Sequence, residues 1–133
     1  MDAKRILIVD DEANMCSIIQ DILSDEGYNV MVAENGSEAL QVVRKITPDL
    51  IITDINMPCM GGLELLREVK NLHTDVQFII MTAFGELETY LNAMSNGAFD
   101  YITKPLNIEM LKIMVAKVLG QGGYMAEGPV QRN

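Results

Sequence analysis

The middle of the chain contains the stretch Leu50-Ile51-Ile52-Thr53, which is followed at once by Asp54. A continuous apolar run of this length is typical of a strand that is buried on both faces, as strands of a parallel sheet are. Four similar runs lie at residues 5–9, 28–33, 78–81 and 99–103. If helices separate these runs, the core of the fold is a parallel sheet.

Segments with helical periodicity do lie between the runs and after the last of them. Asn35-Gly36-Ser37-Glu38 resembles a capping box, with Asn35 as the N-cap and Glu38 at N3. The expected helices span about residues 13–26, 36–46, 63–71, 86–96 and 107–119. This alternation predicts an α/β fold with a doubly wound, five-stranded parallel sheet, flavodoxin-like (βα)5, in strand order 2-1-3-4-5.

Three of these helices have a clear apolar stripe that is expected to face the sheet. The stripes are Met15, Ile18, Ile19, Ile22 and Leu23 in the first helix; Leu87, Tyr90, Leu91 and Met94 in the fourth; and Ile108, Leu111, Val115 and Val118 in the last. Met110 lies at the edge of the last stripe, and Ile113 falls on the side that is expected to face water.

Length and composition narrow the class of protein. The 133 residues fit one domain, expected at 1–119, with a Gly-rich tail or linker at 120–133. The net charge of -9 argues against direct nucleic-acid binding by this chain, because such binding needs clustered basic residues. No apolar run approaches the roughly 20 residues that cross a bilayer, and the first residues lack a signal-peptide pattern. We therefore expect a cytoplasmic protein that does not contact a membrane.

The two cysteines show no metal-ligand spacing. Cys16 lies in a helical segment among apolar residues and is interpreted as a small buried side chain. Cys59 follows Pro58 in an expected loop, and the sequence does not assign it a role.

Polar side chains follow the predicted strands where each strand ends. Asp10 and Asp11 follow the first strand, Asp54 the third, Thr82 the fourth and Lys104 the fifth. Ligands of open α/β sheets bind at the carboxyl ends of the strands, so the three aspartates are expected to converge in one crevice. Three carboxylates in one crevice repel each other, and either protonation or a bound cation would relieve the repulsion. Mg²⁺ suits a site with few carboxylates and several waters.

The same residue types fit phosphoryl transfer. A carboxylate can act as a nucleophile toward phosphorus and form an aspartyl phosphate. The Lys104 ammonium, the Thr82 hydroxyl and Mg²⁺ are groups that would stabilise the negative charge of the incoming phosphoryl group.

Each residue also has a simpler explanation when taken alone. Asp10 or Asp11 could cap a helix, and Asp54 could form an Asx-turn after a strand. Thr82 alone is an ordinary strand-end threonine, and Lys104 alone is an ordinary surface lysine. These explanations do not account for the three aspartates lying together.

Four segments of the sequence resemble the signature motifs of response-regulator receiver domains, and the resemblance covers roughly residues 4–119. The segments are Val9-Asp10-Asp11-Glu12, Asp54-Ile55-Asn56-Met57-Pro58, Met81-Thr82-Ala83 and Thr103-Lys104-Pro105. The resemblance implies that Asp54 is the phosphoacceptor. It implies a Mg²⁺ site made by Asp10, Asp11, Asp54 and the backbone carbonyl of Asn56.

The resemblance assigns roles to further residues. Thr82 would bind a phosphoryl oxygen, Lys104 would pair with the phosphoryl group, and the bond before Pro105 would be cis. Tyr101 would be the switch aromatic, whose side-chain rotamer changes with the position of the Thr82 hydroxyl. Simple packing of its ring against a helix is an equal alternative. Gly62 would allow a tight turn before the third helix, while Gly61 departs from the usual polar residue and would weaken the N-cap of that helix.

The function implied is that of a signalling module in a two-component system, and not of an enzyme with an external substrate. A sensor histidine kinase would be the partner, and segments 81–85 and 96–101 resemble receivers of NtrC-type transcription activators. The output surface would be helix 86–96, strand 99–103 and helix 107–119, which could also form a homodimer.

A haloacid-dehalogenase-type phosphatase is the alternative function, but such enzymes have an Asp where this chain has Asn56. An inert pseudo-receiver is a further alternative, and the intact acidic set argues against it. The cognate kinase, the presence of an output domain and the phosphoryl lifetime stay open.

Overall fold

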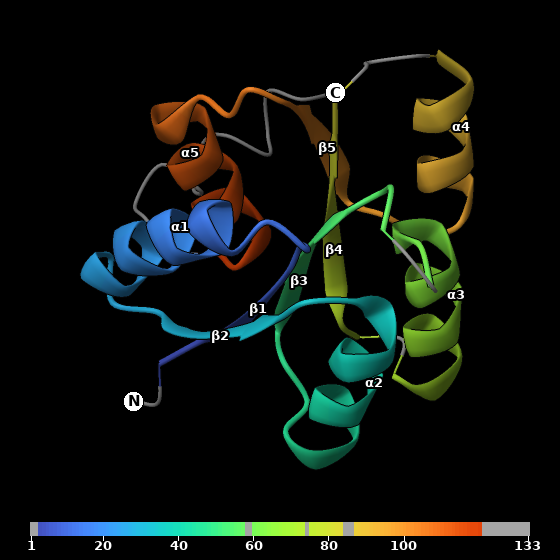
Figure 1. Ribbon diagram of the computed structural model, residues 1–133, viewed down its shortest axis with the longest axis horizontal. Helices are drawn as coiled ribbons and strands as arrows, with labels where there is room; N and C mark the ends of the chain where they lie inside the picture. The colour runs from blue at the N-terminus through green and yellow to red at the C-terminus, as the bar shows by residue number, and fades with distance from the viewer. Residues whose placement is uncertain (1–2, 58–59, 74, 84–86, 121–133) are drawn as a thin grey trace.

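The computed structural model describes residues 3–57, 60–73, 75–83 and 87–120 (Figure 1). Within this part of the chain, five parallel strands form one sheet in the order β2-β1-β3-β4-β5. The strands are β1 (Arg5–Val9), β2 (Asn29–Ala33), β3 (Leu50–Asp54), β4 (Gln77–Thr82) and β5 (Asp100–Thr103). The helices are α1 (Ala13–Asp25), α2 (Gly36–Lys45), α3 (Gly62–Leu72), α4 (Leu87–Ser95) and α5 (Ile108–Val118). The predicted fold class and strand order are confirmed.

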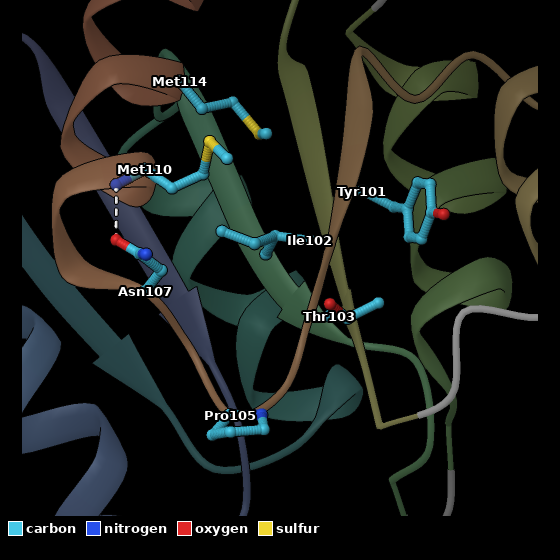
Figure 2. Close-up of a pocket in the computed structure, with 7 residues that line it drawn as sticks. All are labelled: Tyr101, Ile102, Thr103, Pro105, Asn107, Met110 and Met114. Carbon is cyan, nitrogen blue, oxygen red and sulfur yellow. Dashed lines mark hydrogen bonds between the residues drawn. The ribbon is translucent and has the colours of Figure 1, made fainter.

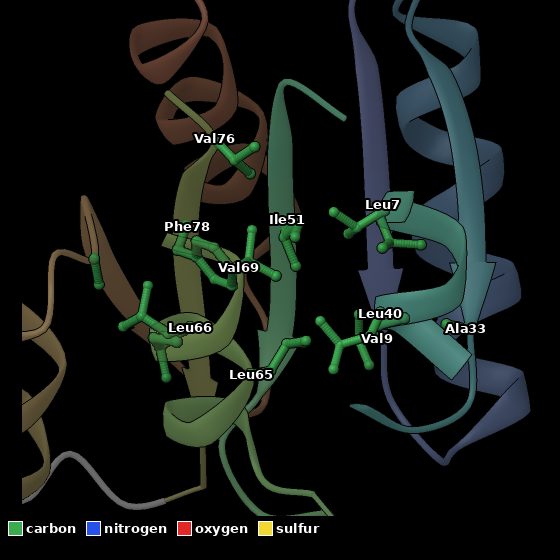
Figure 3. Packing of buried hydrophobic residues seen from close by; sticks show 14 of the residues in the cluster. Leu7, Val9, Ala33, Leu40, Ile51, Leu65, Leu66, Val69, Val76 and Phe78 are labelled. Carbon is green, nitrogen blue, oxygen red and sulfur yellow. The ribbon is translucent and has the colours of Figure 1, made fainter. Parts of the chain in front are cut away.

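Helices cover both faces of the sheet, as Figure 1 shows. The core under α1 and α5 contains Ile6, Ile8, Cys16, Ile19, Leu23, Leu50, Ile52, Ile79, Met81, Ile102, Leu111 and Val115. The core under α2, α3 and α4, drawn in part in Figure 3, contains among others Leu7, Val9, Leu40, Ile51, Leu65, Leu66, Val69, Phe78 and Ile80. Side chains of one strand alternate between the two cores, because successive residues of a strand point to opposite faces.

The central strand β3 pairs with β1 on one side and β4 on the other. All five of its residues are buried, which is the burial that its continuous apolar sequence predicts. Its last residue is Asp54, so this strand carries a carboxylate into the interior at the edge of the sheet.

In the first turn of α2, the predicted N-cap Asn35 is confirmed, but the predicted partner of Glu38 is wrong. The Asn35 side chain accepts a hydrogen bond from the Glu38 amide at 2.8 Å, as an N-cap does. The Glu38 carboxylate, however, accepts from the amide of Glu34 at 2.6 Å. In a capping box that bond would come from the N-cap amide, so the box here is displaced by one residue.

Two apolar residues of the predicted stripes face solvent. Ile18 of α1 is 52% exposed and Leu91 of α4 is 53% exposed. Among the side chains of α4 that the structure describes, which do not include Leu87, Ala93 is fully buried, with Tyr90 and Met94 half-buried beside it. The apolar residues of α1 and α4 do repeat at helical spacing. The side of each of these two helices that the sheet buries is narrower than its apolar stripe, so residues at the edge of the stripe lie in water. In α5 the prediction holds in outline, with Leu111 and Val115 buried, Ile108 and Val118 half-buried, and Ile113 55% exposed.

Several expectations fall partly or wholly outside the described residues. They are the start of α4 at residue 86, the loop residue Cys59 and the tail, of which only Gly120 is described. Among the helices that the structure describes, none is both long enough and apolar enough to span a bilayer.

The orientation of α4 yields a stability prediction. Leu91→Ser should change the free energy of unfolding by no more than about 0.5 kcal/mol, because the side chain is already largely in water. Ala93→Leu should lower it by about 1–3 kcal/mol, because the site has no room for additional carbon atoms. Urea unfolding of both variants measures the difference. The reverse ranking would show that α4 is rotated from this orientation.

Candidate functional site

Three charged residues reach the same side of the sheet because of strand alternation. Asp10, Asp54 and Lys104 each lie two residues after an isoleucine of the core under α1 and α5. Those isoleucines are Ile8, Ile52 and Ile102. Residues two apart on a strand point to the same face, so the three side chains converge where β1, β3 and β5 end.

Lys104 is the centre of the resulting cluster. Its Nζ lies 3.1 Å from Asp10 Oδ2 and 3.2 Å from Asp54 Oδ2, and both contacts are hydrogen bonds. The exposed fractions of the three side chains are 17% for Lys104, 0% for Asp10 and 12% for Asp54. The Glu12 carboxylate, which is exposed, lies 4.0 Å from the same ammonium. One partly buried cation therefore bridges two buried carboxylates.

Backbone amides hold the other oxygen of each buried carboxylate. The Glu12 amide donates to Asp10 Oδ1 at 3.0 Å, and the Asn56 amide donates to Asp54 Oδ1 at 3.3 Å. The Cys16 thiol, buried in α1, donates to the Asp10 carbonyl at 3.3 Å. Burial raises the pKa of that thiol to about 11, so Cys16 is a neutral hydrogen-bond donor and not a reactive thiolate.

The cluster carries more negative charge than its lysine balances. Burial raises the pKa of Asp54 above its ordinary value of 3.8, and the Lys104 ammonium offsets only part of that rise. Burial by itself lowers the pKa of Lys104. Its hydrogen bonds and charge interactions with Asp10 and Asp54 outweigh burial, so the pKa rises above 10.5. The ionised form of Asp54 is therefore destabilised by burial, while the neighbouring Lys104 stays protonated.

The acidic residues also meet the requirements of a cation site. Asp10, Asp11 and Asp54 each offer a carboxylate oxygen, and these oxygens lie within 4.8 Å of one another. An all-oxygen donor set is what hard divalent cations such as Mg²⁺ prefer. Asp11 is exposed, unlike its two partners, so the cluster opens toward solvent on that side.

The remaining predicted residues lie close to this cluster or on the opposite face of the sheet. Thr82 is buried at the end of β4, and the Lys104–Pro105 bond is cis. Tyr101 packs beside the core under α2, α3 and α4, on the face opposite Ile102. Its ring meets that of Tyr90 edge-on, with centroids 5.1 Å apart. Thr82 lies two residues after Ile80, the register partner of Tyr101, so Thr82 and Tyr101 share one face of the sheet.

Comparison with known proteins decides the family. The sequence model of the response regulator receiver domain matches residues 6–116. The chain belongs to this family. It is 38% identical over 125 residues to the transcriptional regulatory protein ZraR of Klebsiella oxytoca, a match that covers 94% of this chain and 28% of that relative. It is 36% identical to the sporulation initiation phosphotransferase F of Bacillus subtilis, covering 87% of this chain and 94% of the relative.

Solved structures agree with this assignment. The chemotaxis protein CheY4 of Vibrio cholerae superposes with a TM-score of 0.84 at 30% identity, and the match covers 88% of this chain and 99% of that one. The receiver domain spans only about a quarter of the ZraR-type relatives, 28% of the one from Klebsiella oxytoca.

The structure adds residues that the sequence did not single out. Glu12 lies beside Lys104, and the Thr53 hydroxyl, fully buried, donates to the Asp54 carbonyl at 3.0 Å. Gly62, which the sequence did single out for a tight turn before α3, is needed for close approach, because a Cβ there would meet the Asp54 carbonyl oxygen and lie 2.9 Å from Ile55 Cα. Adjacency to Asp10 and Asp54 in sequence was the available signal for Glu12 and Thr53. Gly61 caps α3 without a side-chain hydrogen bond, which agrees with the weak cap expected there.

Because the cluster carries excess negative charge, we expect two substitutions to change the free energy of unfolding in opposite directions in metal-free buffer. Asp54→Asn should raise the free energy of unfolding at pH 7 by about 1 kcal/mol, because it removes a costly charge while Lys104 stays paired with Asp10. Lys104→Met should lower it by about 3 kcal/mol or more, because two buried carboxylates lose the cation that contacts them both. Lys112→Met is the matched control, since the Lys112 pairs with Glu26 and Glu109 are surface pairs worth less than about 1 kcal/mol.

The pH dependence of the Asp54→Asn effect follows from the raised pKa. Between 3.8 and the higher native pKa, the folded protein binds more protons at Asp54 than the unfolded chain does. Wild-type stability therefore falls as pH rises through this window, and the variant lacks that fall. The stability difference between variant and wild type should be smallest at acid pH and grow toward neutral pH in denaturant melts. A difference that shrinks with rising pH would contradict the assignment.

Proposed function

We propose that this receiver domain accepts a phosphoryl group on Asp54 from a sensor histidine kinase. The observation that carries the proposal is the buried carboxylate of Asp54, which Lys104 contacts at 3.2 Å beside Asp10 and Asp11. An oxygen of Asp54 attacks phosphorus, and the phosphorus–nitrogen bond of a phosphohistidine breaks. The imidazole leaves with the bonding electron pair, and Asp54 becomes an aspartyl phosphate.

The surrounding residues have distinct parts in this reaction. The Lys104 ammonium neutralises a phosphoryl oxygen, and the Asn56 amide orients the Asp54 carboxylate through its 3.3 Å hydrogen bond. We propose that Asp10, Asp11, Asp54 and the backbone carbonyl of Asn56 hold Mg²⁺. When bound, Mg²⁺ supplies further positive charge for the phosphoryl oxygens. Thr82, at the end of the neighbouring strand β4, is the proposed donor to a phosphoryl oxygen.

The protein acts as a signalling module, and its only chemistry is the gain and loss of its own phosphoryl group. The ZraR-type relatives are transcriptional regulatory proteins, which supports control of transcription as the output. A phosphatase of the haloacid-dehalogenase type is less well supported, because the position two residues after Asp54 is Asn56 and its backbone amide serves Asp54.

Acetyl phosphate with Mg²⁺ should add one phosphoryl group to the wild-type protein. Asp54→Asn should abolish the addition, because the amide is not a nucleophile toward phosphorus, and omission of Mg²⁺ should slow labelling at least about tenfold. Intact-mass spectrometry with time measures both. Asp49→Asn is the control for another acidic residue, since Asp49 lies at the start of β3 and binds the Arg5 amide. Labelling of Asp54→Asn at the wild-type rate would exclude Asp54 as the acceptor.

We propose that the output surface consists of α4, β5 and α5. A groove between β5 and α5 is lined by Tyr101, Ile102, Thr103, Pro105, Asn107, Met110 and Met114 (Figure 2). The Tyr101 ring points away from this groove toward α4, on the Thr82 side of the sheet. Movement of Thr82 toward a phosphoryl group would free space behind it, and Tyr101 could then turn inward and reshape the surface.

The same surface fits a homodimer. Beside the groove, Met110 and Ile113 are more than half exposed, at 51% and 55%. Asp100 and Lys117 flank these apolar residues in an adjoining hollow. Opposite charges on one patch allow two copies to pair about a two-fold axis, each aspartate facing the lysine of its partner.

Phosphorylation should therefore shift the protein from monomer toward dimer in sedimentation velocity. Ile113→Glu should prevent the shift, because it places a charge at the centre of the apolar contact. Leu72→Glu is the control, since Leu72 is 50% exposed at the end of α3, away from this surface. If the phosphorylated wild type remains monomeric, the surface is not a dimer interface.

A further inference from the structure

The connection between β2 and α2 lies directly against the connection between β3 and α3. A Cβ atom placed on Gly36 would lie 2.7 Å from Met60 Cβ, 2.8 Å from Met60 Cγ and 2.9 Å from the Met60 carbonyl oxygen. These are atoms at or near the backbone, and they cannot turn aside as the end of a flexible side chain can. Residue 36 therefore has no room for any side chain while Met60 keeps its place.

Conformation does not explain this glycine. In the described part of the chain, the glycines with positive φ are Gly27, Gly97 and Gly120, and Gly36 is not one of them. Gly36 is instead the first residue of α2, immediately after the N-cap Asn35. Alanine is a better helix former than glycine, so helix stability alone would favour alanine here. The close contact with Met60 is the remaining reason for glycine.

Met60 belongs to the segment that follows Asp54. At its near end, Asn56 donates its amide to Asp54 Oδ1 at 3.3 Å. At its far end, the Gly62 amide donates to the Ile55 carbonyl at 3.0 Å, which folds the segment back on itself. Met60 packs against the core under α2, α3 and α4. Met60 is thus four residues along the chain from Asn56, whose amide is the hydrogen-bond donor to the Asp54 carboxylate.

The β2–α2 connection also touches the other acidic strand end. The Asp10 amide donates to the Ala33 carbonyl at 3.2 Å. The short stretch from Ala33 to Gly36 therefore contacts the chain at Asp10 on one side and Met60 on the other. It spans the two segments that carry the buried carboxylates.

We infer that Gly36 is a positioning residue for the phosphoacceptor: its missing side chain lets Met60 seat against α2, which sets the Asn56 amide on the Asp54 carboxylate. The inference rests on the proposed function of Asp54. Gly36 touches neither the carboxylates nor Lys104, and it acts only through Met60. Its role is distinct from that of Gly62, which makes direct close approach to Asp54 and Ile55.

The test is Gly36→Ala, with two readouts. The rate of labelling by acetyl phosphate and Mg²⁺ should fall roughly tenfold or more, because small misplacements of reacting groups are costly. The amide resonance of Asn56 should move in the nitrogen–proton NMR spectrum of the unphosphorylated, metal-free protein. Asn35→Ala is the matched control, because it removes the Asn35–Glu38 cap from the same helix turn without adding an atom near Met60. It should leave both readouts close to wild type.

A second variant tests the route through Met60. Met60→Gly removes the atoms at 2.7 and 2.8 Å and leaves only the carbonyl oxygen at 2.9 Å. If Gly36 acts through Met60, adding Gly36→Ala to Met60→Gly should slow labelling by a smaller factor than adding it to the wild type, because two of the three close contacts are gone, so the two effects are not additive. Equal slowing in both backgrounds would overturn the inference, as would an Asn56 resonance that Gly36→Ala leaves in place. Failure of the wild type to be labelled would instead reject the proposed function, and the Asn56 resonance would still report on the positioning.

Discussion

The structure depends on one partly buried lysine held between two buried carboxylates. Lys104 contacts Asp10 and Asp54 at almost equal distances, and the pKa values of Lys104 and Asp54 both rise above their ordinary values. If the positive charge equalled the negative charge, the cluster would be an ordinary structural ion pair. Here the acids outnumber the cation, and Asp11 adds another carboxylate at the rim. A site of this kind gains stability from additional positive charge, so it is suited to bind a cation and to be altered by a phosphoryl group.

The fold keeps this strained cluster in place through the sheet. Apolar residues two positions earlier on each of the three strands anchor Asp10, Asp54 and Lys104 in one core. Parallel strands end at the same edge, so their polar ends meet although they are far apart in sequence. Amides of Glu12 and Asn56 then fix the free carboxylate oxygens. Asp54 is thereby the last residue of a strand, whereas Asp10 and Lys104 directly follow the last residues of β1 and β5.

The two faces of the sheet have different roles. The acidic cluster lies at the end of the face covered by α1 and α5, whereas Thr82 and Tyr101 point to the face covered by α2, α3 and α4. The ends of the strands carry residues of both kinds, so in the proposed function they connect the acidic cluster to the second face. The contact of Gly36 with Met60 belongs to that second face as well, and it connects the helix layer to the segment after Asp54.

The sequence by itself determined the fold class, the strand order and the meeting of Asp10, Asp11 and Asp54, because apolar periodicity and strand ends are local properties that a parallel sheet brings together. It also identified the family, through motifs that lie at those strand ends. Tertiary structure decided which arc of each helix is covered, and it left Ile18 and Leu91 in water. It also decided that Lys104 bridges two carboxylates and that Gly36 lies against Met60. Such contacts depend on the distance between elements remote in sequence, and periodicity along one element contains no information on that distance.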